Sequence, residues 1–303
     1  MTMSWLQKDA LKGSFPPLVT PFNEDGSVDY DSYAKLVEFQ IAGGSAGIVV
    51  TGTTGEPSLL LPEERIELLK VAVATARKRV QVVAATGTQN HSGTVAMTQA
   101  AEKAGADAVL IVTPYFVRPP QRGLEAYYLD LCKRTDLPVM IYHIPGRAAV
   151  NMTADSIVRV AQESRNLVGI KHAVNDLALV SDLIARLGPE FRIHVGLEDL
   201  SFPMVCLGAH GLMNAVGNLM PGKVQELYAA TAAGDLARGR ALHYELWELN
   251  QAVFFDINPI PMKYMMKRIG LLPNEAHRLP MVPATPELAR KLDAVLKRAG
   301  LLG

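Results

Sequence analysis

The chain has 303 residues, of which 49% are hydrophobic and 20% are charged. This composition supplies a large apolar core and excludes disordered, collagen-like and coiled-coil chains. Thirty Lys and Arg balance thirty Asp and Glu, so the chain has no overall positive field for holding nucleic acid or an anionic membrane surface.

Neither the cysteines nor the N-terminal segment indicates an exported protein. Cys132 and Cys206 lie far apart and match no disulfide or zinc-ligand spacing. Residues 1–15 contain acids and bases and lack the apolar core of a secretory signal. The uncharged stretch 200–222 contains proline, histidine, asparagine and several glycines, and we predict a buried helix, a strand and a loop there instead of a membrane span. We therefore expect a cytoplasmic protein.

Short β-branched runs recur along the chain, and each is followed by an amphipathic segment rich in Ala, Leu and Glu. This alternation is typical of βα units. Several runs are apolar almost throughout, which favours parallel strands covered on both faces. The predicted strands are Phe15–Thr20, Gly47–Thr51, Val80–Ala85, Ala108–Thr113, Val139–His143, Leu167–His172, Arg192–Gly196 and Gly211–Ala215.

Eight successive units without a linker predict a (β/α)8 TIM barrel over residues 1–222. An open doubly wound sheet with an appended domain is the structural alternative. We predict a C-terminal helical extension over residues 223–303. Its predicted helices are Lys223–Ala233, Leu236–Phe255, a stretch after Pro261 through Arg268, and Pro286–Ala299.

In such a barrel the active residues collect where the strands end, because the loops there form the open concave face. Lys171 interrupts the apolar strand LVGIKHA, where an unpaired charge is expensive. Burial disfavours the charged form of an amine, so this lysine can attack a carbonyl and form a Schiff base. The alternative is a lysine that pairs with a carboxylate or reaches water.

Further polar groups follow the neighbouring strands. Tyr142 ends the run VMIYH, where its hydroxyl could relay protons or simply be solvated. The turn Gly52–Glu56 offers backbone N–H groups and two threonine hydroxyls that suit a small anion, although such a turn alone is often only a turn. Arg147 could bind a second carboxylate or be solvated. His143 and His172 should point away from the barrel interior, and the histidines form no metal-ligand spacing.

Taken together, GTTGE (52–56), TPYF (113–116), YHIPGR (142–147), GIKHA (169–173) and NPIPMK (258–263) resemble the dihydrodipicolinate synthase/N-acetylneuraminate lyase family. The ordered match spans nearly the whole chain. The family consists of (β/α)8 barrels with C-terminal helices, usually homotetramers, that act on pyruvate or related 2-oxo acids without a metal or other cofactor.

The resemblance implies roles for individual residues. Lys171 would form the imine with the 2-oxo acid, and Tyr142 with Thr53 would pass protons. Thr53 and Thr54 would hold the pyruvate carboxylate. Gly196 and Met213 would line the same pocket. Arg147 matches the arginine that holds the carboxylate of the aldehyde in the synthase branch and that sialic acid lyases lack.

Phe116 departs from the family pattern, because synthases usually have a second tyrosine here that reaches into the site of a neighbouring subunit. Phenylalanine keeps the stacking area for substrate binding but removes the hydroxyl. A water or another group would then complete the relay, or the chain performs a related reaction. Pro62, Arg65, Gln89 and Gly93 differ from the polar set that binds lysine in feedback-regulated members, so we expect no inhibition by lysine.

The function we expect is a lyase of lysine biosynthesis that condenses pyruvate, as a lysine imine and enamine, with aspartate 4-semialdehyde. One alternative is an aldolase or dehydratase that acts on a sugar-acid-derived 2-oxo acid through the same imine. Another is a non-catalytic barrel that binds a small acid. The expected partners are a 2-oxo acid, a small aldehyde and other copies of the chain.

Overall fold

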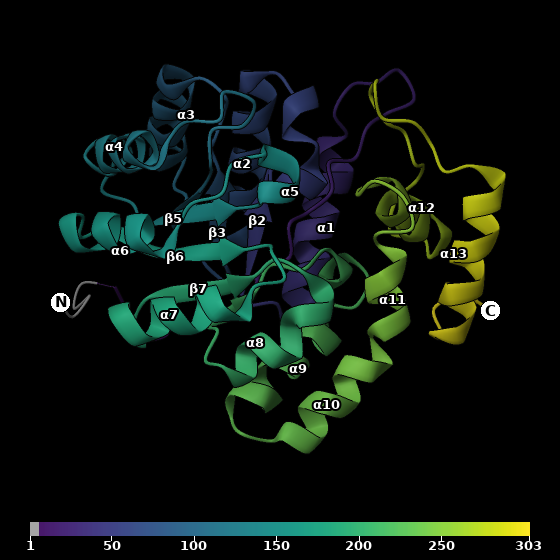
Figure 1. Ribbon diagram of the computed structural model, residues 1–303. Helices are drawn as coiled ribbons and strands as arrows, with labels where there is room; N and C mark the ends of the chain where they lie inside the picture. Colours follow the sequence, from purple (N-terminus) through teal and green to yellow (C-terminus); the bar gives the residue numbers. More distant parts are fainter. Residues whose placement is uncertain (1–5) are drawn as a thin grey trace.

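The computed structural model describes residues 6–303, so the first five residues of the N-terminal segment considered above lie outside the described residues. Eight parallel strands form one sheet in the order β1-β8-β7-β6-β5-β4-β3-β2, with helices around it (Figure 1). The backbone of Val49 bonds to Pro16 and Leu18, which brings the two outer strands together. The predicted TIM barrel is confirmed. Its strands are β1 (Gly13–Ser14), β2 (Gly47–Val50), β3 (Gln81–Ala85), β4 (Ala108–Val112), β5 (Val139–His143), β6 (Leu167–His172), β7 (Arg192–Val195) and β8 (Gly211–Leu212).

The first and last strands are shorter than the sequence predicts. The prediction of a strand over Phe15–Thr20 is wrong, because Pro16 and Pro17 have no N–H to donate and leave only an isolated bridge beyond Ser14. The eighth strand ends at Leu212 instead of Ala215. The N–H of Ala215 bonds to a side chain, the carboxylate of Glu198, and the chain then turns into a short 3-10 helix, η4 (Ala215–Asn218).

Helices connect the strands and begin at clear capping residues. Asp29, Asn90, Thr153 and Asp176 each accept a hydrogen bond from a backbone N–H in the first turn of the helix that follows. The helices between strands and after β8 are α1 (Tyr30–Ala42), α2 (Pro62–Ala76), α3 (His91–Lys103), α4 (Gln121–Cys132), α5 (Pro145–Ala148), α6 (Ala154–Glu163), α7 (Leu177–Leu187), α8 (Ser201–Cys206) and α9 (Pro221–Ala232). The 3-10 turns η1 (Thr53–Gly55), η2 (Pro57–Leu59) and η3 (Glu198–Leu200) follow β2 and β7.

The C-terminal helices lie along one side of the barrel, light green to yellow in Figure 1. They are α10 (Leu236–Glu245), α11 (Trp247–Ala252), α12 (Ile260–Arg268) and α13 (Pro286–Arg298). The prediction of one helix over Leu236–Phe255 is wrong. The helix is interrupted at buried Leu246. Helix α10 packs on α8 and α9, whereas α11 packs on η3 and α13. Within residues 6–303, none of the helices has the length and apolar character needed to cross a membrane.

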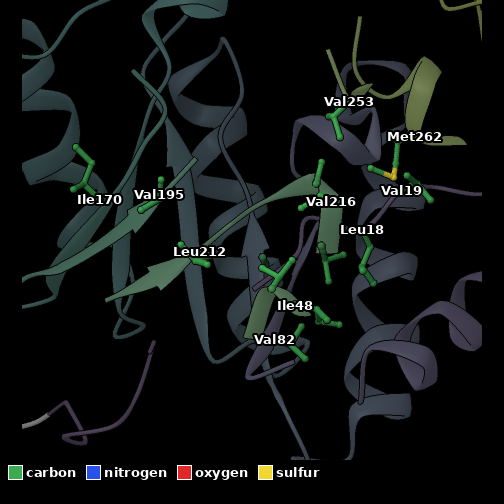
Figure 2. Close-up of a cluster of buried hydrophobic side chains, with 14 of the residues drawn as sticks. Leu18, Val19, Ile48, Val82, Ile170, Val195, Leu212, Val216, Val253 and Met262 are labelled. Carbon is green, nitrogen blue, oxygen red and sulfur yellow. The ribbon is translucent and has the colours of Figure 1, made fainter. Parts of the chain in front are cut away.

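Helix α12 shares the main hydrophobic core with the barrel. Met262 of α12 lies next to Val19, which follows β1, in Figure 2. Both side chains are fully buried. The same cluster contains the labelled strand residues Ile48, Val82, Ile170, Val195 and Leu212. The C-terminal helices are therefore packed against the segments that carry the site.

Candidate active site

A cavity of about 320 Å³ opens where the strands end, between the barrel and the segment around α12. Its polar lining comes from the loops after β2 and β4, from β5, from helices α2 and α5, and from the C-terminal segment. The cavity volume suits a small organic ligand. Its polar and charged lining residues are Thr51, Thr53, Glu56, Ser58, Arg65, Tyr115, Tyr142, Arg147 and Asn258.

Tyr142 and Thr53 meet at the cavity wall. The Tyr142 hydroxyl and Thr53 Oγ1 are 3.1 Å apart, and either group could donate the hydrogen bond. Tyr142 is the fourth residue of β5, and its side chain packs with the cluster inside the barrel. Thr53 begins the η1 turn directly after β2. A phenol in contact with a second hydroxyl can pass a proton between a bound molecule and the neighbouring group.

Lys171 lies beside Tyr142 on the adjacent strand. The two residues are register partners in β5 and β6, and Lys171 Nζ is 4.4 Å from the centroid of the Tyr142 ring. Only 3% of Lys171 is exposed. Within residues 6–303 its amine has no ion pair or hydrogen bond, so the electron-rich face of the ring is its close partner. A buried amine without a carboxylate partner is available for reaction with a carbonyl.

Because Gly196 has no side chain, there is room for the Lys171 side chain beside it. A Cβ atom at Gly196 would lie 2.9 Å from Lys171 Cε and 2.8 Å from Ala173 Cβ, closer than carbon atoms pack. Met213, just after β8, is buried in the same interior cluster as Tyr142. Neither Gly196 nor Met213 lines the cavity itself. They instead shape the barrel interior from which Lys171 and Tyr142 project.

The two threonines of the turn face different surroundings. Thr53 lines the cavity, whereas Thr54 is buried and its Oγ1 accepts a hydrogen bond from Asn258 Nδ2 at 3.0 Å. Asn258 also accepts a bond on its backbone carbonyl from Arg147 Nη2 at 3.2 Å. Arg147 lines the cavity from α5 and has no carboxylate partner within residues 6–303. Its guanidinium can therefore bind an anionic ligand.

Phe116 does not lie with the other predicted site residues. Its side chain is 82% exposed, its φ is +72°, and it does not line the cavity of the single chain. The preceding residue, Tyr115, lines the cavity instead. Of the residues predicted from the sequence, Tyr142 contacts both Lys171 and Thr53; Tyr142 and Thr53 line the cavity, whereas Lys171 lies behind the Tyr142 ring and does not line it.

Two groups near the site were given no role from the sequence: Asn258, and Glu198, which was noted only for its place after the seventh predicted strand. Asn258 opens the motif NPIPMK, where a polar side chain directly before a proline was the available signal. Glu198, after β7, is buried, and its Oε1 accepts the N–H of Ala215 at 2.6 Å. Burial raises the pKa of Glu198 to about 7. The local sequence does not show that Glu198 is buried, so it could not predict this raised pKa.

His143 and His172 lie outside this arrangement. Their Nδ1 atoms are 3.2 Å apart, and their Nε2 atoms contact Asn151 and the carbonyl of Asp176, in the segments leading to α6 and α7. Burial lowers the pKa of both imidazoles, which favours their neutral forms. In the described part of the chain, no three His, Cys, Asp or Glu side chains gather in a way that could hold a metal ion.

Comparisons with known proteins agree with this geometry. A model of the dihydrodipicolinate synthetase family matches residues 10–299. The 4-hydroxy-tetrahydrodipicolinate synthase of Thermus thermophilus is 40% identical over 292 residues, which cover 96% of this chain and 97% of the relative. That of Fervidobacterium nodosum is 39% identical over 285 residues, covering 94% and 97%.

Solved structures give the same result. The dihydrodipicolinate synthase of Aquifex aeolicus superposes with a TM-score of 0.94 at 37% identity, covering 96% of this chain and 98% of that one. A chloride-inhibited dihydrodipicolinate synthase from Acinetobacter baumannii, complexed with pyruvate, has a TM-score of 0.94 at 35% identity, covering 97% and 100%. The resemblance inferred from the motifs is confirmed, and the chain belongs to the dihydrodipicolinate synthetase family of lyases.

Proposed function

We propose that this protein is a 4-hydroxy-tetrahydrodipicolinate synthase, which condenses pyruvate with aspartate 4-semialdehyde through an imine on Lys171. The observation that carries the proposal is the buried Lys171 amine, 4.4 Å from the ring of Tyr142, whose hydroxyl contacts Thr53. The relatives that bear this name, at up to 40% identity, support the choice of reaction. The pyruvate named in the complex of the Acinetobacter baumannii protein supports the choice of 2-oxo acid.

The chemistry follows from these groups. The neutral amine of Lys171 attacks C2 of pyruvate, and the resulting carbinolamine loses water to give the imine. Loss of a proton from C3 gives the enamine, whose C3 attacks the aldehyde carbon, and the new alkoxide takes up a proton. The amino group of the bound semialdehyde then attacks the imine carbon and displaces Lys171, which closes the ring. Pyruvate and the semialdehyde thus give 4-hydroxy-tetrahydrodipicolinate and one water.

Tyr142 and Thr53 serve the proton transfers in this scheme. Their 3.1 Å contact lets the phenol give up a proton and recover it through the threonine hydroxyl. The backbone and hydroxyls of Thr53 and Thr54 hold the pyruvate carboxylate, and Gly196 and Met213 shape the barrel interior beside Lys171 and Tyr142. Arg147, on the cavity wall without a carboxylate partner, holds the carboxylate of the semialdehyde.

We further propose a cytoplasmic homotetramer. The family resemblance supports the homotetramer, and the absence of a disulfide spacing between Cys132 and Cys206 supports the cytoplasmic location. The 82% exposure of Phe116 on the single chain supports a proposed contact of its ring with a neighbouring copy. Because Phe116 has no hydroxyl, the last link of the proton relay would be a water molecule or another group near Tyr142.

Borohydride trapping tests the proposal. Reduction in the presence of pyruvate should fix an adduct on Lys171, located by peptide mass spectrometry. Lys263, another lysine that is only 1% exposed, should stay unmodified and serves as the internal control. No adduct would make the chain a non-catalytic binder of small acids. An adduct with semialdehyde condensation no faster than background would favour the aldolase or dehydratase alternative, which a screen of 2-oxo acids in the cleavage direction would identify.

A further inference from the structure

Glu56 closes the turn after β2 and points inward. Its backbone has φ of +56°, a left-handed conformation that is uncommon for residues other than glycine, and its N–H bonds to the carbonyl of Thr53. The side chain of Glu56 is only 2% exposed, yet it lines the cavity. Burying a carboxylate and holding a non-glycine residue in the left-handed region both cost free energy, so Glu56 needs interactions that offset these costs.

The partners of Glu56 come from the C-terminal segment. Lys263 Nζ lies 2.6 Å from Oε1, and His277 Nδ1 lies 3.1 Å from Oε2. The side chains of Lys263 and His277 are 1% and 0% exposed. Lys263 also donates to the carbonyl of Ala276 at 2.9 Å and lies 4.2 Å from the centroid of the Phe22 ring, so its position is set on three sides. Burial lowers the pKa of Lys263, and the carboxylate of Glu56 opposes that effect.

A second link between the same two segments lies close by. Asn258 Nδ2 donates to Thr54 Oγ1, and the carbonyl of Asn258 accepts from Arg147. The turn that carries Thr53 and Thr54 is thus linked to the C-terminal segment at Thr54 and at Glu56. The turn has little internal support of its own, because it consists of a single 3-10 turn.

We propose that Glu56 is a positioning residue for the 2-oxo acid site, and that the C-terminal segment sets the geometry of the carboxylate-binding turn by holding Glu56 between Lys263 and His277. This inference rests on the proposed function, because it assigns the turn to the pyruvate carboxylate. Glu56 does not touch the reacting atoms in this scheme. It acts by fixing the backbone N–H groups of the turn in place, whereas the Thr53 hydroxyl is held by its own contact with Tyr142.

The test is steady-state kinetics of Glu56→Gln and Lys263→Met in the full-length protein. Loosening the turn should weaken carboxylate binding, so KM for pyruvate should rise by about tenfold or more in each variant. The value of kcat should fall much less, and KM for the semialdehyde should stay near that of the wild type. Because the two residues act as one unit, the double variant should raise KM for pyruvate by less than the product of the single effects.

Glu64→Gln is the matched control. Glu64 forms an ion pair with Arg278 at 2.6 Å and therefore also fastens the C-terminal segment, but it does not line the cavity. It should leave KM for pyruvate unchanged. An equal rise in Glu64→Gln, or an unchanged KM in a folded Glu56→Gln, would overturn the inference. If Glu56→Gln does not fold, His277→Gln, which alters only one of the two contacts, should give a smaller rise in the same KM, and its absence would also overturn the inference.

The failure of this inference can be told apart from failure of the proposed function. If the wild-type protein traps pyruvate on Lys171 while the variants keep a normal KM, only the positioning role of Glu56 is wrong. If the wild type traps no pyruvate, both proposals fall.

Discussion

Replacing Gly196 by alanine should disable imine formation without unfolding the barrel. The new Cβ would lie 2.9 Å from Lys171 Cε and 2.8 Å from Ala173 Cβ. Carbon atoms pack at about 3.5–4.0 Å, so Lys171 Cε would have to move by roughly 0.6–1.1 Å. A displacement of about 1 Å at a reacting group can slow a reaction about 100-fold. The crowding itself should destabilise the fold by about 1–3 kcal/mol.

The assay is the rate at which pyruvate is trapped on Lys171 by borohydride, together with kcat/KM for the condensation. Gly146→Ala is the matched control, because a Cβ there would meet no atom within 4 Å although Gly146 lies next to Arg147. That variant should react at close to the wild-type rate. Circular dichroism and thermal unfolding establish that both variants are folded. If a folded Gly196→Ala traps pyruvate as fast as the wild type, the close approach between Gly196 and Lys171 does not govern reactivity, and the reasoning fails.

Three further predictions concern the relay, pH and inhibition. Thr53→Val keeps the shape but removes the hydroxyl that contacts Tyr142, and kcat should fall about 10²- to 10⁴-fold; a kcat within a factor of about three of the wild type would remove Thr53 from the relay. Burial raises the pKa of Glu198 from 4.5 to about 7, so its contribution to stability is fully present below pH 4.5 and is lost as the pH rises through about 7. In urea titrations, the free energy of unfolding of Glu198→Gln relative to the wild type should therefore increase from pH 5 to pH 8, and a constant difference would contradict the assignment. Millimolar lysine should leave the initial rate unchanged, because the family resemblance implies that Pro62, Arg65, Gln89 and Gly93 do not form a lysine-binding set, and the guanidinium of buried Arg65 already donates to the carbonyl of Ala85 at 2.7 Å; inhibition would contradict this expectation.

Local sequence was sufficient to predict most of the strands. The β-branched runs at Val139–His143 and Leu167–His172 match β5 and β6 residue for residue, because a strand buried on both faces needs apolar side chains at nearly every position. The first strand was mispredicted since hydrophobicity does not report the missing N–H groups of Pro16 and Pro17. The break at Leu246 was missed because it depends on which surfaces α10 and α11 cover.

The candidate site divides in a similar way. Lys171 could be identified from its own strand, since a cation within an apolar run signals either function or a hidden partner. Family motifs added Tyr142 and Thr53, but only the closed barrel brings their hydroxyls to 3.1 Å. Parallel strands place their carboxyl ends at one face, which explains why residues 89 positions apart can meet there.

The sequence by itself determined the barrel class and the family and singled out Lys171 as the candidate nucleophile, because these follow from residue type and from order along the chain. Only the tertiary structure showed which buried groups contact the turn that carries Thr53 and Thr54. Glu56 and His277 are 221 positions apart, and no periodicity or motif relates them. Their contact exists because the C-terminal helices fold back onto the barrel core, where a buried carboxylate is stable only beside buried groups that can pair with it.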